Sequence, residues 1–139
     1  MTILEKVRNY FMDCPLMDGY KINVDYLGVE AVEYTIDTTP TSTVIKPYAD
    51  GGALKQFSFV IGSRNYYGAD VMNNIENSGF YEALVDWFDE QNKIGNLPVL
   101  NGGKVVNMIE ALTPGYLFGV TEDTARYQIQ CRIVYYEDK

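Results

Sequence analysis

The residues of this chain that could do chemistry are carboxylates, tyrosines and two cysteines, and none of them has a histidine to work with. The 139 residues contain no His at all. Histidine is the usual general base, the usual nitrogen ligand for a metal and the usual partner of a nucleophile. Its absence excludes most hydrolase and transferase mechanisms, so we expect no enzyme and no catalytic residues.

The densest group of carboxylates lies within the stretch 80–93. Such a group could hold Ca²⁺ or Mg²⁺, or supply an acid and base pair. The acidic positions are Glu82, Asp86, Asp89 and Glu90. They lie opposite an apolar stripe formed by Phe80, Leu84, Trp87 and Phe88. Charge opposite an apolar stripe is the ordinary pattern of an amphipathic helix. We therefore interpret the carboxylates as a solvated helix face and expect no metal.

The cysteines and the glycine-rich stretches have equally plain interpretations. Cys14 and Cys131 are too few for a zinc site and indicate reduced core residues. The stretches Asp50-Gly51-Gly52 and Asn101-Gly102-Gly103 match no phosphate-binding loop, so they predict turns. No cofactor is expected from these residues.

Composition and charge limit the partners. A formal net charge of -8 argues against a nucleic-acid binder that works by neutralising phosphates. No stretch approaches the ~18 apolar residues of a membrane span, and no basic segment followed by an apolar run is present at either end. We expect one domain over residues 1–139, kept in a reducing cytosol, with no membrane partner.

The stretch 124–137 is the element that the other elements must meet. Its residues alternate between an apolar face and a polar face, which is typical of a half-buried strand. The apolar face holds Tyr127, Ile129, Cys131, Ile133 and Tyr135, and the polar face holds Arg126, Gln128, Gln130 and Arg132. We place the strand predicted at 55–64 beside it.

The remaining patterns predict two helices and further strands. Thr2 and Glu5 form a capping box before a helix at 2–14, and Asn77-Ser78 offers an N-cap for a helix at 80–93. The other elements expected are strands at 20–27, 30–39 and 104–112, an edge strand at 44–48, a helical turn or two at 69–76, and a loop from 113 to 124. This order predicts an α+β fold, a largely antiparallel or mixed sheet packed against two helices.

The expected core joins the longer helix to the sheet. Its residues are Phe57, Phe59, Ile61, Leu84, Trp87, Phe88, Ile129, Cys131 and Ile133. The pairs Tyr66-Tyr67 and Tyr135-Tyr136 could stack on bases or on a protein partner, although core and rim packing is the simpler interpretation.

Several motifs together resemble a known family. They are QFSFVIGSRNYYGADV, the ENSGFYEAL stretch, NLPVL, IEALTPGYLFGV and the closing TARYQIQCRIVYYE. The chain resembles small phage and prophage tail proteins of Gram-positive bacteria, of the tail-terminator or minor tail class, over nearly its whole length. Members often carry the label "chloramphenicol resistance protein". That label implies a chloramphenicol acetyltransferase. An acetyltransferase of that kind is recognised by a catalytic His, which this chain lacks.

The resemblance implies a structural role in a virion tail, after assembly in the bacterial host cytoplasm. It implies a ring of six copies at the head-proximal end of the tail tube, with the tube protein and neck proteins as partners. A head-tail connector subunit is an alternative, and so is the acyltransferase that the label suggests. The resemblance supplies no catalytic, cofactor-binding or metal-binding residues.

The surplus of aromatic residues indicates where copies would touch. Twelve Tyr exceed what the core of a small domain needs, and Tyr is enriched where protein surfaces meet. The turn-rich segments 38–53 and 113–123 have too little apolar periodicity for the core. Their aromatics Tyr48, Tyr116 and Phe118 are therefore our predicted oligomer interface, reached by head-to-tail contacts.

Overall fold

The computed structural model describes residues 2–17, 22–24, 33–40, 42–66, 71–120 and 124–138. Within these ranges the helical elements are α1 (Ile3–Met12), the 3-10 helix η1 (Pro15–Met17) and α2 (Val71–Ile94). The strands in the same ranges are β1 (Ile22–Val24), β2 (Glu33–Thr38), β3 (Val44–Pro47), β4 (Ala53–Tyr66), β5 (Lys104–Ala111), β6 (Tyr116–Val120) and β7 (Thr124–Glu137).

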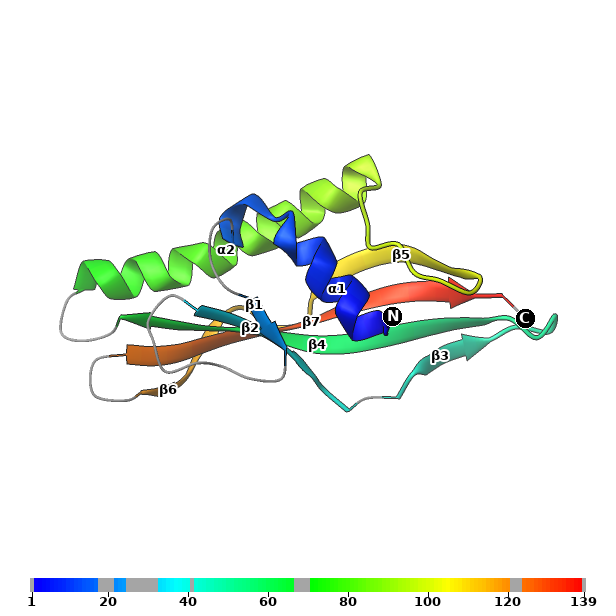
Figure 1. Ribbon diagram of the computed structural model, residues 1–139, viewed down its shortest axis with the longest axis horizontal. Coiled ribbons are helices and arrows are strands. Elements are labelled where there is room, and N and C mark those ends of the chain that lie inside the picture. Colours follow the sequence, from blue (N-terminus) through cyan, green and yellow to red (C-terminus); the bar gives the residue numbers. More distant parts are fainter. Residues whose placement is uncertain are drawn as a thin grey trace.

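The strands form one sheet in the order β1-β2-β4-β7-β5, with β3 extending the sheet beside β4 and β6 extending it beside β7. Strands β1 and β2 are parallel, whereas the other pairs are antiparallel. Figure 1 shows α1 and α2 together on one face of this sheet. The predicted α+β fold, with a largely antiparallel sheet packed against two helices, is confirmed.

The axis of the sheet is the pair β4 and β7. They are antiparallel along their whole lengths, from Ala53 opposite Glu137 to Tyr66 opposite Thr124. The predicted neighbours are therefore confirmed as neighbours. Because side chains alternate along a strand, the odd-numbered residues of both strands face the helices and the even-numbered residues face away from them. We call the second face the helix-free face.

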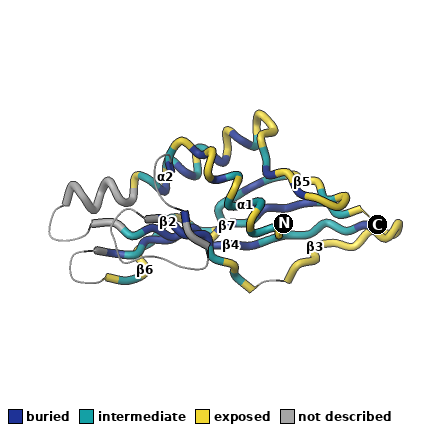
Figure 2. Tube along the Cα trace, in the orientation of Figure 1, coloured by how far each residue is buried: buried dark blue, intermediate teal, exposed yellow. Residues whose placement is uncertain are grey.

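The core lies between the helices and the odd-numbered residues of β4 and β7 (Figure 2). Phe11 of α1 contacts Phe59 and Phe88, with ring centroids 5.9 Å apart in both cases. Of the nine predicted core residues, Phe57 and Trp87 are half-buried against the core and the other seven are buried. The predicted faces of the longer helix and of the C-terminal strand are therefore confirmed.

The predicted cap of α1 and the two predicted glycine turns are also confirmed. Thr2 and Glu5 form the capping box of α1. Gly95 follows α2 with a φ of 73°, in the left-handed region that favours glycine at a helix end. Gly51 has a φ of 94° and closes the turn between β3 and β4, and Gly102 and Gly103 turn the chain into β5.

The middle of the chain differs from the prediction. Helix α2 runs without a break from Val71 to Ile94, so the separate short helix at 69–76 and the N-cap at Asn77-Ser78 are wrong. Residues 69 and 70 lie outside the described part. Continuing a helix through Asn, Ser and Gly costs ~1 kcal/mol or less per residue, whereas starting a new helix requires a costly nucleus. The turn-forming residues at 77–79 were therefore overridden by the helix on both sides of them.

The loop predicted from 113 to 124 is also wrong, because β6 lies within it. Strand β5 ends at Ala111, opposite Cys131, and leaves the first part of β7 without a neighbour on that side. Strand β6 fills this place by pairing with residues 125–128 of β7. Buried backbone groups need partners, and β6 supplies them.

The predicted strands at 20–27 and 30–39 correspond to β1 and β2 where the structure describes them. Residues 20, 21, 25–27 and 30–32 of those predictions lie outside the described part. The predicted edge strand at 44–48 is confirmed as β3, which pairs with β4 and is exposed along its length.

Candidate interaction surfaces

The three predicted interface residues lie on two separate surfaces. Tyr48 follows β3 near one end of the sheet, whereas Tyr116 and Phe118 belong to β6 at the other end (Figure 1). The strand pairing agrees, because β3 pairs with the start of β4 and β6 pairs with the start of its antiparallel neighbour β7. The structure therefore brings Tyr116 and Phe118 together and keeps Tyr48 apart from them.

The first surface, which we call the β3 surface, consists of Val44, Ile45 and Tyr48. These side chains are 47%, 42% and 39% exposed. The ammonium group of Lys46 lies 5.5 Å from the ring centroid of Tyr48, a cation–π arrangement that holds the ring at the surface. Large apolar side chains exposed together are typical of protein contacts.

A groove of about 620 Å³ lies beside the β3 surface on the helix-free face. It is lined by Tyr48, Ala49, Asp50, Leu54, Val105, Asn107 and Tyr136. The ring centroids of Tyr48 and Tyr136 are 5.9 Å apart, and the hydroxyl of Tyr136 donates to Oδ2 of Asp50 at 3.4 Å. Partial burial, followed by the nearby Asp50 carboxylate, raises the pKa of Tyr136, so its phenol is neutral at physiological pH. The groove therefore presents aromatic rings and one carboxylate.

The second surface, which we call the β6 surface, consists of Leu117, Phe118 and Val120. They are 44%, 64% and 51% exposed. An irregularity in the pairing between Leu117 and Gly119 turns Phe118 toward the guanidinium of Arg126, which lies 5.4 Å from its ring centroid. The guanidinium is fixed in turn by an ion pair of 2.7 Å with Asp37 of β2. Phe118, the most exposed side chain of β6, therefore packs against a guanidinium group that an ion pair holds in place.

Tyr116 has a different environment from Phe118. Its hydroxyl oxygen accepts hydrogen bonds from Nε2 of Gln128 at 2.6 Å and from Nε2 of Gln130 at 3.3 Å. Both donors belong to β7, so the hydroxyl fastens β6 to the sheet. The half-buried ring is the part of Tyr116 that remains for a partner.

On the helix-free face, β7 carries the polar residues that its alternation predicted, namely Arg126, Gln128, Gln130 and Arg132. The guanidinium of Arg132 donates to Oε1 of Glu110 at 2.6 Å and to Oε1 of Gln56 at 2.9 Å. Arg132 is thus paired with a carboxylate of the neighbouring strand β5, and Arg126 is paired with Asp37 of β2, on the far side of β4. Each of these two guanidinium groups already has a carboxylate partner.

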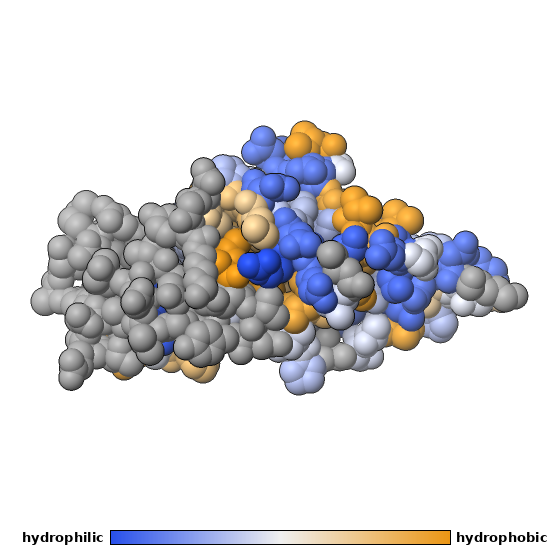
Figure 3. Space-filling view, in the orientation of Figure 1, coloured by the Kyte–Doolittle hydropathy of each residue, from blue (hydrophilic) through white to orange (hydrophobic). Residues whose placement is uncertain are grey.

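A third apolar surface lies beyond the end of α2. Figure 3 shows hydrophobic atoms at the end of α2 and over β5, with hydrophilic atoms over α1. Its exposed residues are Ile94, Val99 and Val105, at 66%, 78% and 61%. A hollow of about 260 Å³ adjoins it, with Leu97, Pro98 and Leu100 in its wall. The motif NLPVL therefore lies partly at the surface, with Pro98 and Leu100 buried and Val99 exposed.

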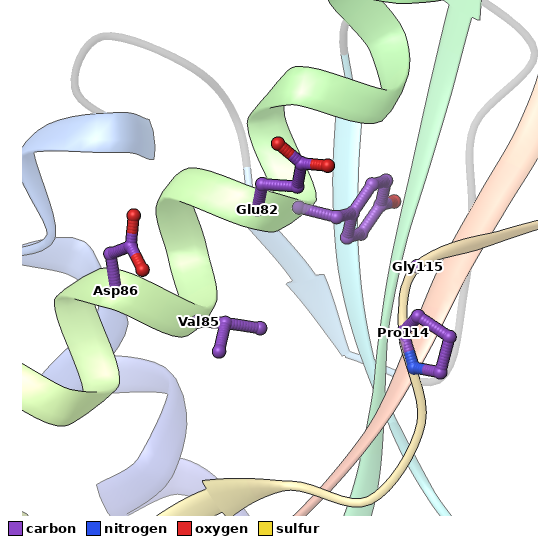
Figure 4. Close-up of a pocket in the computed structure, with 6 residues that line it drawn as sticks. Glu82, Val85, Asp86, Pro114 and Gly115 are labelled. Carbon is purple, nitrogen blue, oxygen red and sulfur yellow. The ribbon is translucent and has the colours of Figure 1, made fainter.

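A hollow of about 380 Å³ lies between α2 and the connection from β5 to β6 (Figure 4). Tyr81, Glu82, Val85 and Asp86 line it from the helix, and Pro114 and Gly115 line it from the connection. Glu82 and Asp86 are exposed, and their carboxyl groups lie away from Pro114 and Gly115. They belong to the solvated helix face that the sequence predicted.

The hydroxyl of Tyr81 is already engaged below this hollow. It is 2.5 Å from Oγ of Ser63 and donates to the carbonyl oxygen of Tyr127 at 2.9 Å. Burial raises the pKa of Tyr81 well above its usual range, which keeps the phenol neutral. The hydroxyl therefore acts as a link between α2, β4 and β7.

The thiols of Cys14 and Cys131 are packing groups of the core. Cys14 and Cys131 are both free and fully buried, and burial raises the pKa of each thiol. The thiolate is the nucleophilic form, so neither sulfur is activated. Among the described residues no group of three acidic, Cys or His side chains is arranged to hold a metal. No helix of the described part is both long enough and apolar enough to span a membrane.

Comparison with models of known protein families and with curated proteins gives no match for this chain. The arrangement of its surfaces must therefore carry the functional argument.

Two of the three residues of the β6 surface, Leu117 and Val120, are not among the predicted interface residues. Leu117 and Val120 fall within the loop that the sequence predicts after the breaker Thr113-Pro114-Gly115. The available signal was the run of three large side chains at 116–118, which is richer in strand-forming residues than most loops.

Proposed function

We propose that this chain is a structural subunit of a phage or prophage tail, of the tail-terminator or minor tail type. Copies would assemble into a ring, six in number as the family resemblance implies, at the head-proximal end of the tail tube. The ring would meet the tube protein on one side and neck proteins on the other.

One observation carries this proposal, namely the presence of two different apolar surfaces at opposite ends of a long sheet. The β3 surface and the β6 surface differ in residues and in position, so each would contact the other type on a neighbouring copy. Contacts between unlike surfaces generate rings when the rotation closes. A third surface at Ile94, Val99 and Val105 would then be left for the tube or neck protein.

The charge of the chain is compatible with a passage for DNA. With a net charge of -8, a ring of such subunits repels phosphate more than it binds it. A terminator or connector must let the genome pass without holding it. A connector would use the same ring, so it remains the second candidate, distinguished by the partner that the ring binds.

The acyltransferase suggested by the family label has less support. The chain contains no His, and both thiols lie in the core with raised pKa values. A transferred acyl group therefore meets no activated nucleophile and no imidazole base at these positions.

The test measures mass by light scattering across a concentration series, with and without purified tail tubes, and locates the protein by electron microscopy. A ring at the head-proximal tube end is the expected result. A chain that is monomeric at every concentration and absent from tube ends would overturn the proposal. Turnover of chloramphenicol with acetyl-CoA at about one per second or faster would favour the enzyme instead.

A further inference from the structure

We propose that neighbouring copies join edge to edge, with β6 of one copy adding as an antiparallel strand beside β3 of the next. One β-sheet would then continue from subunit to subunit. This inference rests on the proposed function, because it names the contact through which a ring would close.

The directions of the strands make this pairing possible. Strand β3 is antiparallel to β4, β4 is antiparallel to β7, and β7 is antiparallel to β6, so β3 and β6 run in opposite directions. They also lie on opposite edges of the sheet, β3 on the edge that carries β2 and β6 on the edge that carries β5. Two copies with their helices on the same side, offset along the strand direction because β3 and β6 lie at opposite ends of the sheet, therefore bring β6 against β3 as an antiparallel pair, the slightly stabler kind of ladder.

Both strands have one side open to such a partner. In the part of the chain that the structure describes, β3 pairs with β4 and with no further strand, and β6 pairs with β7 and with no further strand. An open strand edge offers backbone donors and acceptors to another chain. The open edges of β3 and β6 thus both offer backbone hydrogen-bonding groups, and their directions suit an antiparallel pair.

Strand β5 lies on the same edge of the sheet as β6, but its outer backbone groups at Ile109 already have a hydrogen-bond partner. The side chain of Asn92 donates from Nδ2 to the carbonyl oxygen of Ile109 at 2.7 Å and accepts from the backbone N–H of Ile109 at 3.0 Å. This amide occupies the backbone groups that an added strand would need at that point. Along this edge the described structure therefore directs strand addition toward β6.

The side chains favour a second copy as the occupant. Strand β6 has no charged residue, and the exposed apolar residues of β3 are Val44 and Ile45. In a chain of net charge -8, two copies can approach closely where neither brings a carboxylate. The one charge in β3 belongs to Lys46, which is a cation. Apolar surface on both edges would be buried by the pairing.

Strand β3 also limits where pairing can occur. Pro47 lacks a backbone N–H, and Lys46 is a charged residue of the kind that protects exposed edges. The pairing is therefore directed to the end of β3 that carries Val44 and Ile45. A short ladder with one defined end gives a fixed register, which a closed ring needs and an uncontrolled aggregate lacks.

Thiol cross-linking tests the pairing directly. The native Cys14 and Cys131 are fully buried, so cysteines introduced at the surface are the reactive ones. The variants Val44→Cys and Leu117→Cys are purified separately, mixed at assembling concentration and treated with a short bis-maleimide. We expect a cross-linked dimer in the mixture and none in either variant alone. Met12→Cys, 55% exposed at the end of α1, is the control and should link to neither.

A second measurement does not depend on cross-linking. Val44→Lys adds a charge to the β3 edge and should raise the concentration of half-assembly about tenfold or more, a change equal to one strong contact in an interface. Met12→Lys adds the same charge at the end of α1 and should leave the assembly concentration unchanged. Circular dichroism establishes that both variants are folded.

The outcomes separate this inference from the proposed function. Cross-linking of Val44→Cys or Leu117→Cys with itself would mean that like edges pair, and the inference would be wrong. Assembly without any β3–β6 cross-link would overturn the strand pairing and leave the ring intact. A cross-linked assembly that never binds a tail tube would support the pairing and overturn the tail function. A chain that is monomeric throughout would overturn both.

Discussion

At the scale of single residues, the core depends most on the aromatic group between the helices and the sheet. Phe88 is 1% exposed, and its ring centroid lies 5.9 Å from that of Phe11. We expect Phe88→Ala to lower the free energy of unfolding by about 3 to 5 kcal/mol, because it removes packed aromatic surface and leaves a cavity. Chemical denaturation measures the change.

The exposed neighbour Asp89 is the control for this prediction. Asp89→Ala should change the free energy of unfolding by no more than about 0.5 kcal/mol. A loss below about 1 kcal/mol for Phe88→Ala would mean that α2 presents a different face to the sheet.

Gly115 is a position where the structure leaves no room for a larger side chain. A Cβ at this position would overlap the ring of Tyr81, which cannot move freely because its hydroxyl is held by Ser63 and Tyr127. We expect Gly115→Ala to cost about 1 to 3 kcal/mol of stability, the usual range for an overpacked site.

Gly119 provides the matched control, since a Cβ there would have no atom within 4 Å. Gly119→Ala should leave the melting temperature nearly unchanged. Equal melting temperatures for the two variants would show that the connection after β5 adjusts to the added methyl group and that the contact with Tyr81 is loose.

At the scale of elements, Asn92 joins α2 to β5 through both hydrogen bonds with Ile109. Asn92→Ala would leave a backbone N–H and a carbonyl oxygen without these partners, so we expect a loss of about 1 to 3 kcal/mol. The amide proton of Ile109 should also exchange faster. Lys93→Ala, at the next and exposed position, serves as the control. Unchanged exchange at Ile109 would show that the edge of β5 is protected by something other than Asn92.

Three strands are joined near the β3 end of the sheet by Glu137. Its carboxylate lies 2.8 Å from the ammonium of Lys55 on β4 and 3.5 Å from that of Lys104 on β5. The hydrogen bond from Lys55 lowers the pKa of Glu137, partial burial opposes this, and Lys104 lowers it further. The carboxylate is therefore the favoured form in the folded chain.

This lowered pKa predicts a dependence of stability on pH. The unfolded pKa is about 4.3, so the contribution is fully present above that pH and is lost as the pH falls through the lower folded value. We expect Glu137→Gln to flatten the fall in stability below about pH 4.3. Denaturation at a series of pH values measures this, with exposed Glu90→Gln as control. Parallel curves for wild type and Glu137→Gln would contradict it.

Some helices and strands could be predicted from the sequence and others could not. Strand β7 was predictable because its alternation is long and unbroken, and α1 was predictable because Thr2 and Glu5 mark its start. The continuity of α2 through Gly79 was not, since it depends on the cost of a new helix nucleus and not on the residues at the break. Strand β6 was missed because it forms where β7 lacks a neighbour beyond the end of β5.

The candidate site was predictable only in part for the same reason. Aromatic surplus and turn-rich segments pointed to Tyr48, Tyr116 and Phe118, but strand pairing decided that they form two surfaces. The hydrogen bonds that fasten the Tyr116 hydroxyl to Gln128 and Gln130 could not be foreseen either. They depend on β6 lying beside β7, a contact that local sequence does not encode.

At the scale of the whole molecule, the net charge opposes self-association, whereas the apolar edges of β3 and β6 favour it. Each copy carries a formal charge of -8, so copies repel as they approach. The Debye length falls from ~30 Å at 0.01 M salt to ~10 Å at 0.1 M, which shortens the range of that repulsion. The contact inferred between β3 and β6 is apolar and has no ion pair for salt to weaken. Added salt should therefore strengthen self-association.

We expect the concentration of half-assembly, measured by light scattering, to fall as NaCl is raised over this range. The double variant Glu82→Gln with Asp86→Asn removes two negative charges from the exposed face of α2, outside β3 and β6, and should show a shallower dependence on salt. Assembly that weakens with salt in the wild-type chain would mean that ion pairs hold the copies together. The contact would then have to be sought at the charged residues of the chain, because the apolar edges of β3 and β6 offer no such pairs.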